Sequence, residues 1–139
     1  MIAGVDHHPP NHAEVPSLVD GMCLYVNQNW SRGPIHLASY LMWSVNWIHP
    51  FFGGNGRTAR AVSYLVLCAR LGFRIPGTPT IPESIAAERG PYYRASQAAD
   101  TAWADGRIDL SEMEALMTGL LAKQLLAVHR QATGNPDRL

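Results

Sequence analysis

The stretch HPFFGGNGRTAR, residues 49–60, combines residue types that can bind phosphate groups. It holds three glycines, which allow backbone turns that side chains forbid: Gly53, Gly54 and Gly56. This loop runs into the start of a helix, where free N–H groups and the helix dipole attract anions. Arg57 and Arg60 are three residues apart in the first turn, which predicts that both guanidinium groups lie on one side of it. The pattern predicts a site for more than one phosphate.

Two further polar residues of this stretch can take part in the chemistry. His49 precedes the loop at the end of a helix, where an imidazole with a pKa near neutrality could accept a proton from an attacking hydroxyl. Asn55 carries both a donor and an acceptor, so it can hold the turn or contact a phosphate oxygen. A glycine-rich connection with an incidental histidine and solvated arginines is the alternative on G-N-G alone. The joint spacing of these residues favours a functional site.

The elements that must position this stretch are predicted to be helices. Apolar residues recur at helical spacing over residues 14–30, and Pro34 opens a second helix that ends at His49 and Pro50. Residues 61–69 are apolar on nearly every side, which predicts a central, buried helix stopped by Gly72.

The second half of the chain continues the helical pattern. Residues 75–83 form a proline-rich loop, residues 84–90 a short helical turn, and Pro91 opens another helix. A last helix is capped by Asp109 or Ser111 and ends near residues 133–134. We found no strand pattern and no internal repeat. The prediction is an all-α domain of five or six helices, with the central buried helix directly after the loop.

Composition narrows the class of protein. A chain of 139 residues with 47% hydrophobic and 16% charged residues is expected to fold as one packed domain. The net charge is zero and no run of Lys or Arg occurs, so neither a nucleic-acid partner nor an anionic membrane is expected. Cys23 and Cys68 are typical of reduced, buried thiols in a cytoplasmic chain, and neither a signal peptide nor a membrane span is predicted.

Residues 49–60 resemble the active-site signature of the Fic family, H-x-F-x-[D/E]-G-N-G-R-x-x-R. The matching residues are His49, Phe51, Gly54, Asn55, Gly56, Arg57 and Arg60. The resemblance extends from about Val15 to the segment YYRASQAAD at 92–100. It implies the all-α Fic fold and a protein adenylyltransferase, which transfers AMP from ATP to a Ser, Thr or Tyr hydroxyl of a target protein.

The resemblance also implies a role for each matching residue. His49 would be the general base, and Phe51 would anchor the loop in the core. The backbone from Gly54 to Gly56 would form the anion hole, with Asn55 on the α-phosphate. The two arginines, Arg57 and Arg60, would bind the β- and γ-phosphates.

Gly53 departs from the family pattern, which has Asp or Glu there to coordinate the Mg²⁺ that bridges the phosphates. Glycine offers no carboxylate, so the protein has no metal ligand at this position and should hold Mg²⁺ more weakly. We expect the rate to fall by about 10² to 10³ for a site that is otherwise intact. The alternatives are a nucleotide-binding or interaction module without catalysis, and transfer of another phosphate-containing group such as phosphoryl or phosphocholine.

A second departure concerns regulation. Many family members carry an inhibitory helix with the pattern [S/T]-x-x-x-E-[G/N]. Ser84 and Glu88 in SIAAER fit it, but Arg89 occupies the last place, so we interpret the inhibitory helix as absent and Glu88 as a surface residue. Residues 14–139 would form the Fic domain. Residues 1–13, with surface histidines such as His7, are interpreted as a coil, at most a remnant of the family's target-positioning hairpin. We therefore expect a longer protein with a further inhibitory or targeting segment at its N-terminus.

Overall fold

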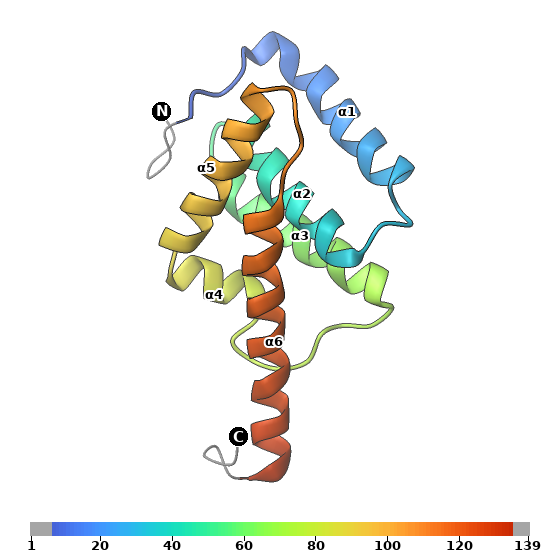
Figure 1. Ribbon diagram of the computed structural model, residues 1–139, viewed down its shortest axis with the longest axis vertical. Coiled ribbons are helices and arrows are strands. Elements are labelled where there is room, and N and C mark those ends of the chain that lie inside the picture. The colour runs from blue at the N-terminus through green and yellow to red at the C-terminus, as the bar shows by residue number, and fades with distance from the viewer. Residues whose placement is uncertain (1–6, 135–139) are drawn as a thin grey trace.

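The computed structural model describes residues 7–134, and within that range all regular structure is helical. The elements are, in chain order, η1 (His12–Glu14), α1 (Val15–Gln28), α2 (Pro34–Ile48), α3 (Asn55–Leu71), α4 (Ile81–Ala87), α5 (Gly90–Ala104) and α6 (Ser111–Thr133). Figure 1 shows them as one bundle, with α6 extending beyond the other helices. The predicted all-α class is confirmed, because no strand occurs among these residues.

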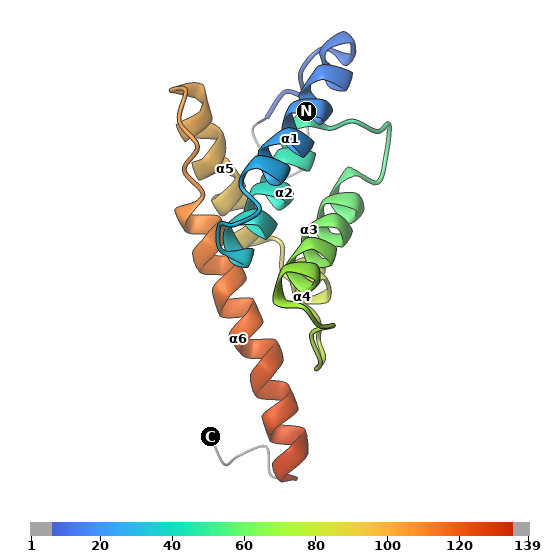
Figure 2. The ribbon, with the colours of Figure 1, turned by 90° about the vertical axis from the view of Figure 1, so that its right-hand side faces the viewer.

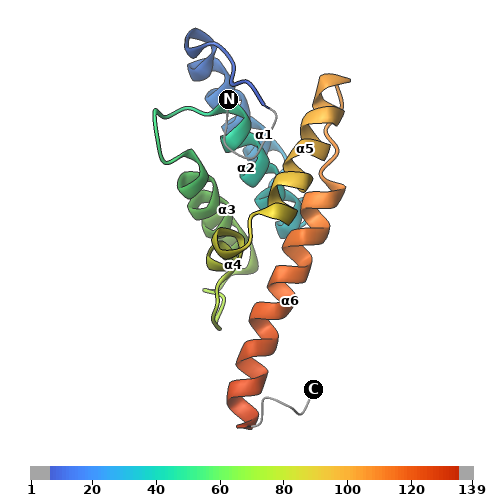
Figure 3. The same ribbon diagram turned by 90° about the vertical axis from the view of Figure 1, so that its left-hand side faces the viewer.

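The centre of the bundle is α2, which has ten buried residues out of fifteen. Figures 2 and 3 show α2 between α3 on one side and α5 and α6 on the other. The prediction that the helix after the loop would be central is wrong. Only one face of α3 is buried, at the i, i+4 positions Asn55, Ala59, Ser63 and Leu67. The apolar run on its other faces is partly solvated, with Leu65 67% exposed.

Small residues bring α3 close to α2. Ala59 and Ser63 are fully buried at this contact, and the Ser63 hydroxyl donates to the Ala38 carbonyl at 2.8 Å. Because both side chains are short, the two helices approach closely and the first turn of α3 lies beside the last turn of α2. This packing sets the position of the loop between them, residues 49–54.

The observed helix ends differ from the prediction mainly at α4. Residues 81–83 were predicted to be loop, but α4 begins at Ile81 because Thr80 caps it, its hydroxyl accepting from the Glu83 N–H. Pro82 is compatible with the first turn, where its missing N–H costs nothing. At the last helix the predicted cap is wrong, because the N-cap is Leu110, which lies between Asp109 and Ser111 and makes no capping hydrogen bond. Asp109, one residue earlier, still accepts from the Ser111 N–H at 3.0 Å.

A buried glutamine on α6 forms hydrogen bonds to the backbone of the segment that connects α3 to α4. Gln124 is fully buried, and its carbonyl oxygen accepts from the Ile81 N–H at 2.9 Å. Its amide nitrogen lies 3.2 Å from both the Ile75 and the Pro76 carbonyl oxygens. This one side chain satisfies backbone groups that helix formation leaves unpaired.

The cysteines are less buried than predicted. Both are free thiols, but Cys23 is exposed and Cys68 is half-buried. The reason for Cys23 is its position on α1, where only Val26 is buried. Within residues 7–134, no helix combines the length and apolar character needed to cross a membrane.

Candidate functional site

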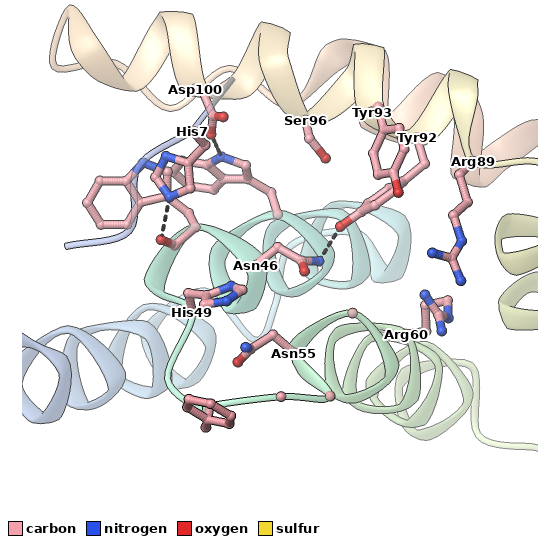
Figure 4. A pocket seen from close by; sticks show the side chains of 16 residues that line it. His7, Asn46, His49, Asn55, Arg60, Arg89, Tyr92, Tyr93, Ser96 and Asp100 are labelled. Atoms are coloured by element: carbon pink, nitrogen blue, oxygen red, sulfur yellow. Dashed lines mark hydrogen bonds between the residues drawn. The ribbon is translucent and has the colours of Figure 1, made fainter. Parts of the chain in front are cut away.

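A pocket of about 300 Å³ opens between the loop, the end of α2 and the first half of α5 (Figure 4). Six of the residues singled out from the sequence line it: His49, Gly53, Gly54, Asn55, Gly56 and Arg60. Phe51 and Arg57 are not among its lining residues. The opposite wall comes from α5, and it includes Tyr92 and Ser96.

The loop is held by the Asn55 side chain. Its Oδ1 accepts from the Phe51 N–H at 2.9 Å, and its Nδ2 donates to the Phe51 carbonyl at 2.8 Å. Asn55 is 4% exposed, so the side-chain partner in both hydrogen bonds is buried. Of the two roles open to this residue from its type, holding the turn is the one its contacts support. Gly54 completes the turn in the left-handed region, at φ +81°.

Phe51 does not anchor the loop through its ring. Its side chain is 52% exposed and lies outside the buried core, which contradicts the role implied by the resemblance. The backbone of Phe51 is the fixed part, since both of its polar groups bond to Asn55. The loop is therefore anchored by amide hydrogen bonds, and the adjacent Phe52 is exposed as well.

The first amides of α3 are available to an anion. The Thr58 N–H bonds to the Gly54 carbonyl at 2.9 Å and is the first of the helical series. The N–H groups of residues 55–57 have no hydrogen-bond partner within the described residues 7–134. They belong to the turn whose N–H groups an α-helix leaves unpaired, and the positive end of the helix dipole adds to their attraction for negative charge.

The two arginines lie in different places, contrary to the prediction that they share one side. Arg60 lines the pocket, whereas Arg57 is exposed and lines a shallow hollow on the outside of the loop together with Phe51 and Thr58. A Cβ at Gly54 would lie 3.4 Å from Arg57 Nη2, so the Arg57 side chain folds back over this glycine. The spacing of Arg57 and Arg60 along the helix determines the direction in which each side chain leaves the backbone. The bend of the loop then determines which surface each guanidinium reaches.

His49 ends α2 in an unusual backbone conformation. It has φ 54° and ψ 57°, and it is the one non-glycine residue with positive φ among residues 7–134. Its N–H still bonds to the Val45 carbonyl at 2.9 Å, while its side-chain Nδ1 is buried and has no hydrogen-bond partner in the described structure. Burial, and next the nearby His7, lower the pKa of the imidazole below its usual value of 6.5. A neutral imidazole at the pocket wall can accept a proton.

His7 was interpreted as a surface residue of a coil, and this is wrong. Its Nε2 lies 2.7 Å from the Trp47 carbonyl oxygen, its ring centroid lies 5.6 Å from that of Trp47, and it is half-buried in the pocket wall. The polar composition of the first residues contains no signal for this contact, which joins positions forty residues apart.

Asn46 and Tyr92 are site residues that sequence reasoning missed or left without a role. Asn46 Nδ2 donates to the Tyr92 hydroxyl and, at 3.1 Å, to the Met42 carbonyl. Burial raises the pKa of Tyr92 to about 12, so its phenol stays neutral. A signal did exist for Asn46, because it precedes His49 by three residues and so lies on the same face of α2.

The residues of the pocket do not fit the family's Mg²⁺ site. Among residues 7–134, Asp100 is the one carboxylate that lines the pocket; it accepts from Trp43 Nε1 at 2.8 Å and lies across the pocket from the loop in Figure 4. Residues 7–134 contain no group of three or more His, Cys, Asp or Glu side chains that could hold a metal. A Cβ built at Gly53 would meet nothing within 4 Å, so the lack of a ligand there is not imposed by packing.

The SIAAER segment brings no acidic group to the pocket either. Glu88 caps the C-terminus of α4, is exposed and is not a lining residue. The next residue, Arg89, does line the pocket. The interpretation of Glu88 as a surface residue agrees with this position.

Comparison with protein-family models gives a match over the N-terminal part of the chain. The model of the Fic/DOC family matches residues 1–67 of the chain. The matched range contains α1, α2, the loop and most of α3, and it includes the complete stretch from His49 to Arg60. The resemblance seen in this stretch is thereby confirmed over that part of the chain.

Proposed function

Because the Fic/DOC family model matches residues 1–67, we propose that the chain is a protein adenylyltransferase impaired by Gly53. Family membership indicates a transferase of the AMPylation type in general. The finer proposal is that the chain transfers AMP from ATP to a Ser, Thr or Tyr hydroxyl of a target protein. The observation that carries it is the presence of His49 and the unpaired amides of α3 in one pocket.

His49 supplies the base in this proposal. It accepts the proton of the target hydroxyl as the hydroxyl oxygen forms a bond to the α-phosphorus of ATP. The bond from that phosphorus to the bridging oxygen breaks, and pyrophosphate leaves with the electron pair. Its lowered pKa favours the neutral imidazole, which is the form needed for this step.

The start of α3 stabilises the charge on the phosphates. The amides of residues 55–57 point unpaired from the helix end, and Arg60 adds a positive charge beside them. We retain Arg57 as a second phosphate ligand, because an exposed arginine can rotate away from Gly54 toward the pocket at little cost. Asn55 acts through the loop geometry, since its amide is already bonded to Phe51.

Gly53 explains the proposed impairment. The loop offers Mg²⁺ no carboxylate. Mg²⁺ bound together with the nucleotide would therefore be held more weakly than in relatives with an acidic residue at this position. The α-phosphate is then less well oriented toward His49.

Restoring the acidic residue tests the proposal. Gly53→Asp should raise the labelling of proteins from ATP labelled at the α-phosphate by about 10² to 10³. The control is Gly53→Asp combined with His49→Ala, which should return labelling to background. Because the space around Gly53 is open, the variant should fold like the parent chain, as thermal unfolding would verify. An unchanged labelling rate in a folded Gly53→Asp variant that binds ATP would reject impairment by Gly53.

A second candidate is a nucleotide-binding module without catalysis, and the missing carboxylate at Gly53 is the observation that favours it. Calorimetry would then detect ATP binding while neither the parent chain nor Gly53→Asp labels any protein. Transfer of another group is distinguished by the label. ATP labelled at the γ-phosphate would mark the target if phosphoryl is transferred, and the mass added to the target identifies AMP, phosphoryl or phosphocholine.

A further inference from the structure

Two guanidinium groups face each other at one end of the pocket. Arg60 extends from the first turns of α3 and Arg89 from the residue before α5, and Figure 4 shows their charged ends pointing toward one another. Both residues line the pocket. They come from elements on opposite walls, so a group between them can be contacted from two sides.

Arg60 is placed over the start of α3 by the glycine beneath it. A Cβ added at Gly56 would lie 3.3 Å from Arg60 Nη1, which is closer than a side chain normally allows. The missing side chain therefore lets the guanidinium lie against the turn that carries the unpaired amides. An anion bound to those amides would therefore lie next to the guanidinium of Arg60.

In the part of the chain that the structure describes, no acidic residue neutralises this end of the pocket. Neither arginine takes part in an ion pair within the described residues, and the pocket's one carboxylate, Asp100, lies at the opposite end in Figure 4. Two like charges that face each other repel, and the repulsion is relieved by an anion between them. A planar guanidinium binds two phosphate oxygens at once, so a terminal phosphate with its exposed oxygens suits this space.

The order of groups along the pocket gives the direction of the ligand. In Figure 4, His49, Asn55, Arg60 and Arg89 follow one another from the loop toward the start of α5. A nucleotide whose reacting phosphate lies near His49 would therefore direct its outer phosphates toward the two arginines.

From this arrangement we infer that Arg89 is a further phosphate-binding residue, which together with Arg60 holds the terminal phosphate of a nucleoside triphosphate. The inference rests on the proposed function for the identity of the ligand. It adds a source of specificity: the chain selects triphosphates over monophosphates because only the longer ligand reaches both guanidinium groups.

Calorimetric titration of the full chain with ATP, ADP and AMP tests the inference. Arg89→Ala should weaken ATP binding about tenfold and leave AMP binding unchanged, since a contact to the terminal phosphate is lost. Arg89→Lys should recover part of the loss, because it keeps the charge but not the planar fork. Arg94→Ala is the matched control, since Arg94 is an exposed arginine of the same helix that does not line the pocket.

The outcomes separate this inference from the proposed function. If Arg60→Ala weakens ATP binding while Arg89→Ala behaves like Arg94→Ala, the role of Arg89 is overturned and the nucleotide site stands. If Arg89→Ala weakens ATP and AMP binding equally, Arg89 contacts another part of the nucleotide and the inference is again wrong. If neither the parent chain nor Gly53→Asp binds any of the three nucleotides, the proposed function itself falls.

Discussion

Asn55 closes the loop on Phe51 by bonding both to its N–H and to its carbonyl, at 2.9 and 2.8 Å. Asn55 is the first residue of α3, and its buried side chain fixes Phe51, the residue that follows His49 and Pro50. The position of His49 relative to the unpaired amides depends on this pair. The Phe51 ring adds little to this anchoring, because it is half exposed.

The first prediction concerns this amide. Asn55→Ala should lower the free energy of unfolding by about 1 to 3 kcal/mol, because two backbone groups of Phe51 lose their buried partner. Asn55→Asp should also destabilise, since a carboxylate can accept from the Phe51 N–H but repels its carbonyl oxygen. Urea denaturation measures both. Equal stability of Asn55→Ala and the parent chain would contradict the assigned role.

The pH dependence of labelling should reflect the environment of His49. Burial and the nearby His7 lower its pKa below 6.5, so the imidazole remains neutral, and able to act as a base, at pH values where a free histidine is already protonated. In Gly53→Asp, the acid limb of kcat/KM should therefore lie below pH 6.5.

Replacing His7 should shift the acid limb of the pH profile of kcat/KM. His7→Ala removes a residue that lowers the pKa of His49 and that forms part of the pocket wall. The pKa of His49 should therefore rise, and activity should be lost at higher pH than before. His8→Ala is the control, because His8 is exposed and does not line the pocket. If the acid limb of the pH profile shifts equally in both variants, or in neither, then His7 does not affect the pKa of His49.

Gln124 should be the most sensitive polar position of the bundle. Gln124→Leu fills a similar volume but leaves the Ile81 N–H and the Pro76 carbonyl without their partner, which should cost about 3 kcal/mol. The Ile75 carbonyl keeps the Tyr64 hydroxyl as a donor. Gln97→Leu, on the exposed face of α5, should change the stability by less than about 0.5 kcal/mol. Thermal and urea unfolding of the two variants provide the comparison.

Alanine substitutions at two glycines can distinguish the energetic cost of backbone strain from that of a steric clash. Gly77 and Gly106 both have positive φ, but a Cβ at Gly77 would lie 2.4 Å from the Gln124 carbonyl oxygen, whereas one at Gly106 would meet nothing within 4 Å. Gly106→Ala should cost only the left-handed conformation, about 1 kcal/mol. Gly77→Ala should cost roughly 3 kcal/mol, because α6 and the loop must also move apart. Similar losses in both variants would argue against this close approach.

The helices and the glycine-rich loop could be predicted because their signals are local. Pro34, the loop glycines and Gly72 act within a few residues of their own position, and the structure agrees on the elements that they delimit. The start of α4 was predicted too late, because the capping signal of Thr80 was hidden among prolines. Burial of α3 was overestimated, since an apolar run does not say how many neighbours a helix will find.

The rest of the candidate site depends on contacts between distant residues. Tyr92 meets Asn46 across forty-six positions and His7 meets Trp47 across forty, so neither pairing follows from a local pattern. The exposed ring of Phe51 and the outward course of Arg57 result from the bend of the loop, which spacing alone does not describe. Sequence reasoning predicted which residues form the loop, but not which of them face one another.

Because the surroundings of Gly53 are open, a substitution there can change activity without changing stability, two properties that often oppose each other in enzymes. Substitutions that improve chemistry commonly weaken the scaffold, because reactive groups are packed at some cost in stability. A side chain at Gly53 would extend into open space, so its presence or absence leaves the helices undisturbed. The lineage of this chain could therefore silence or regain its chemistry by one codon change, without a compensating substitution elsewhere.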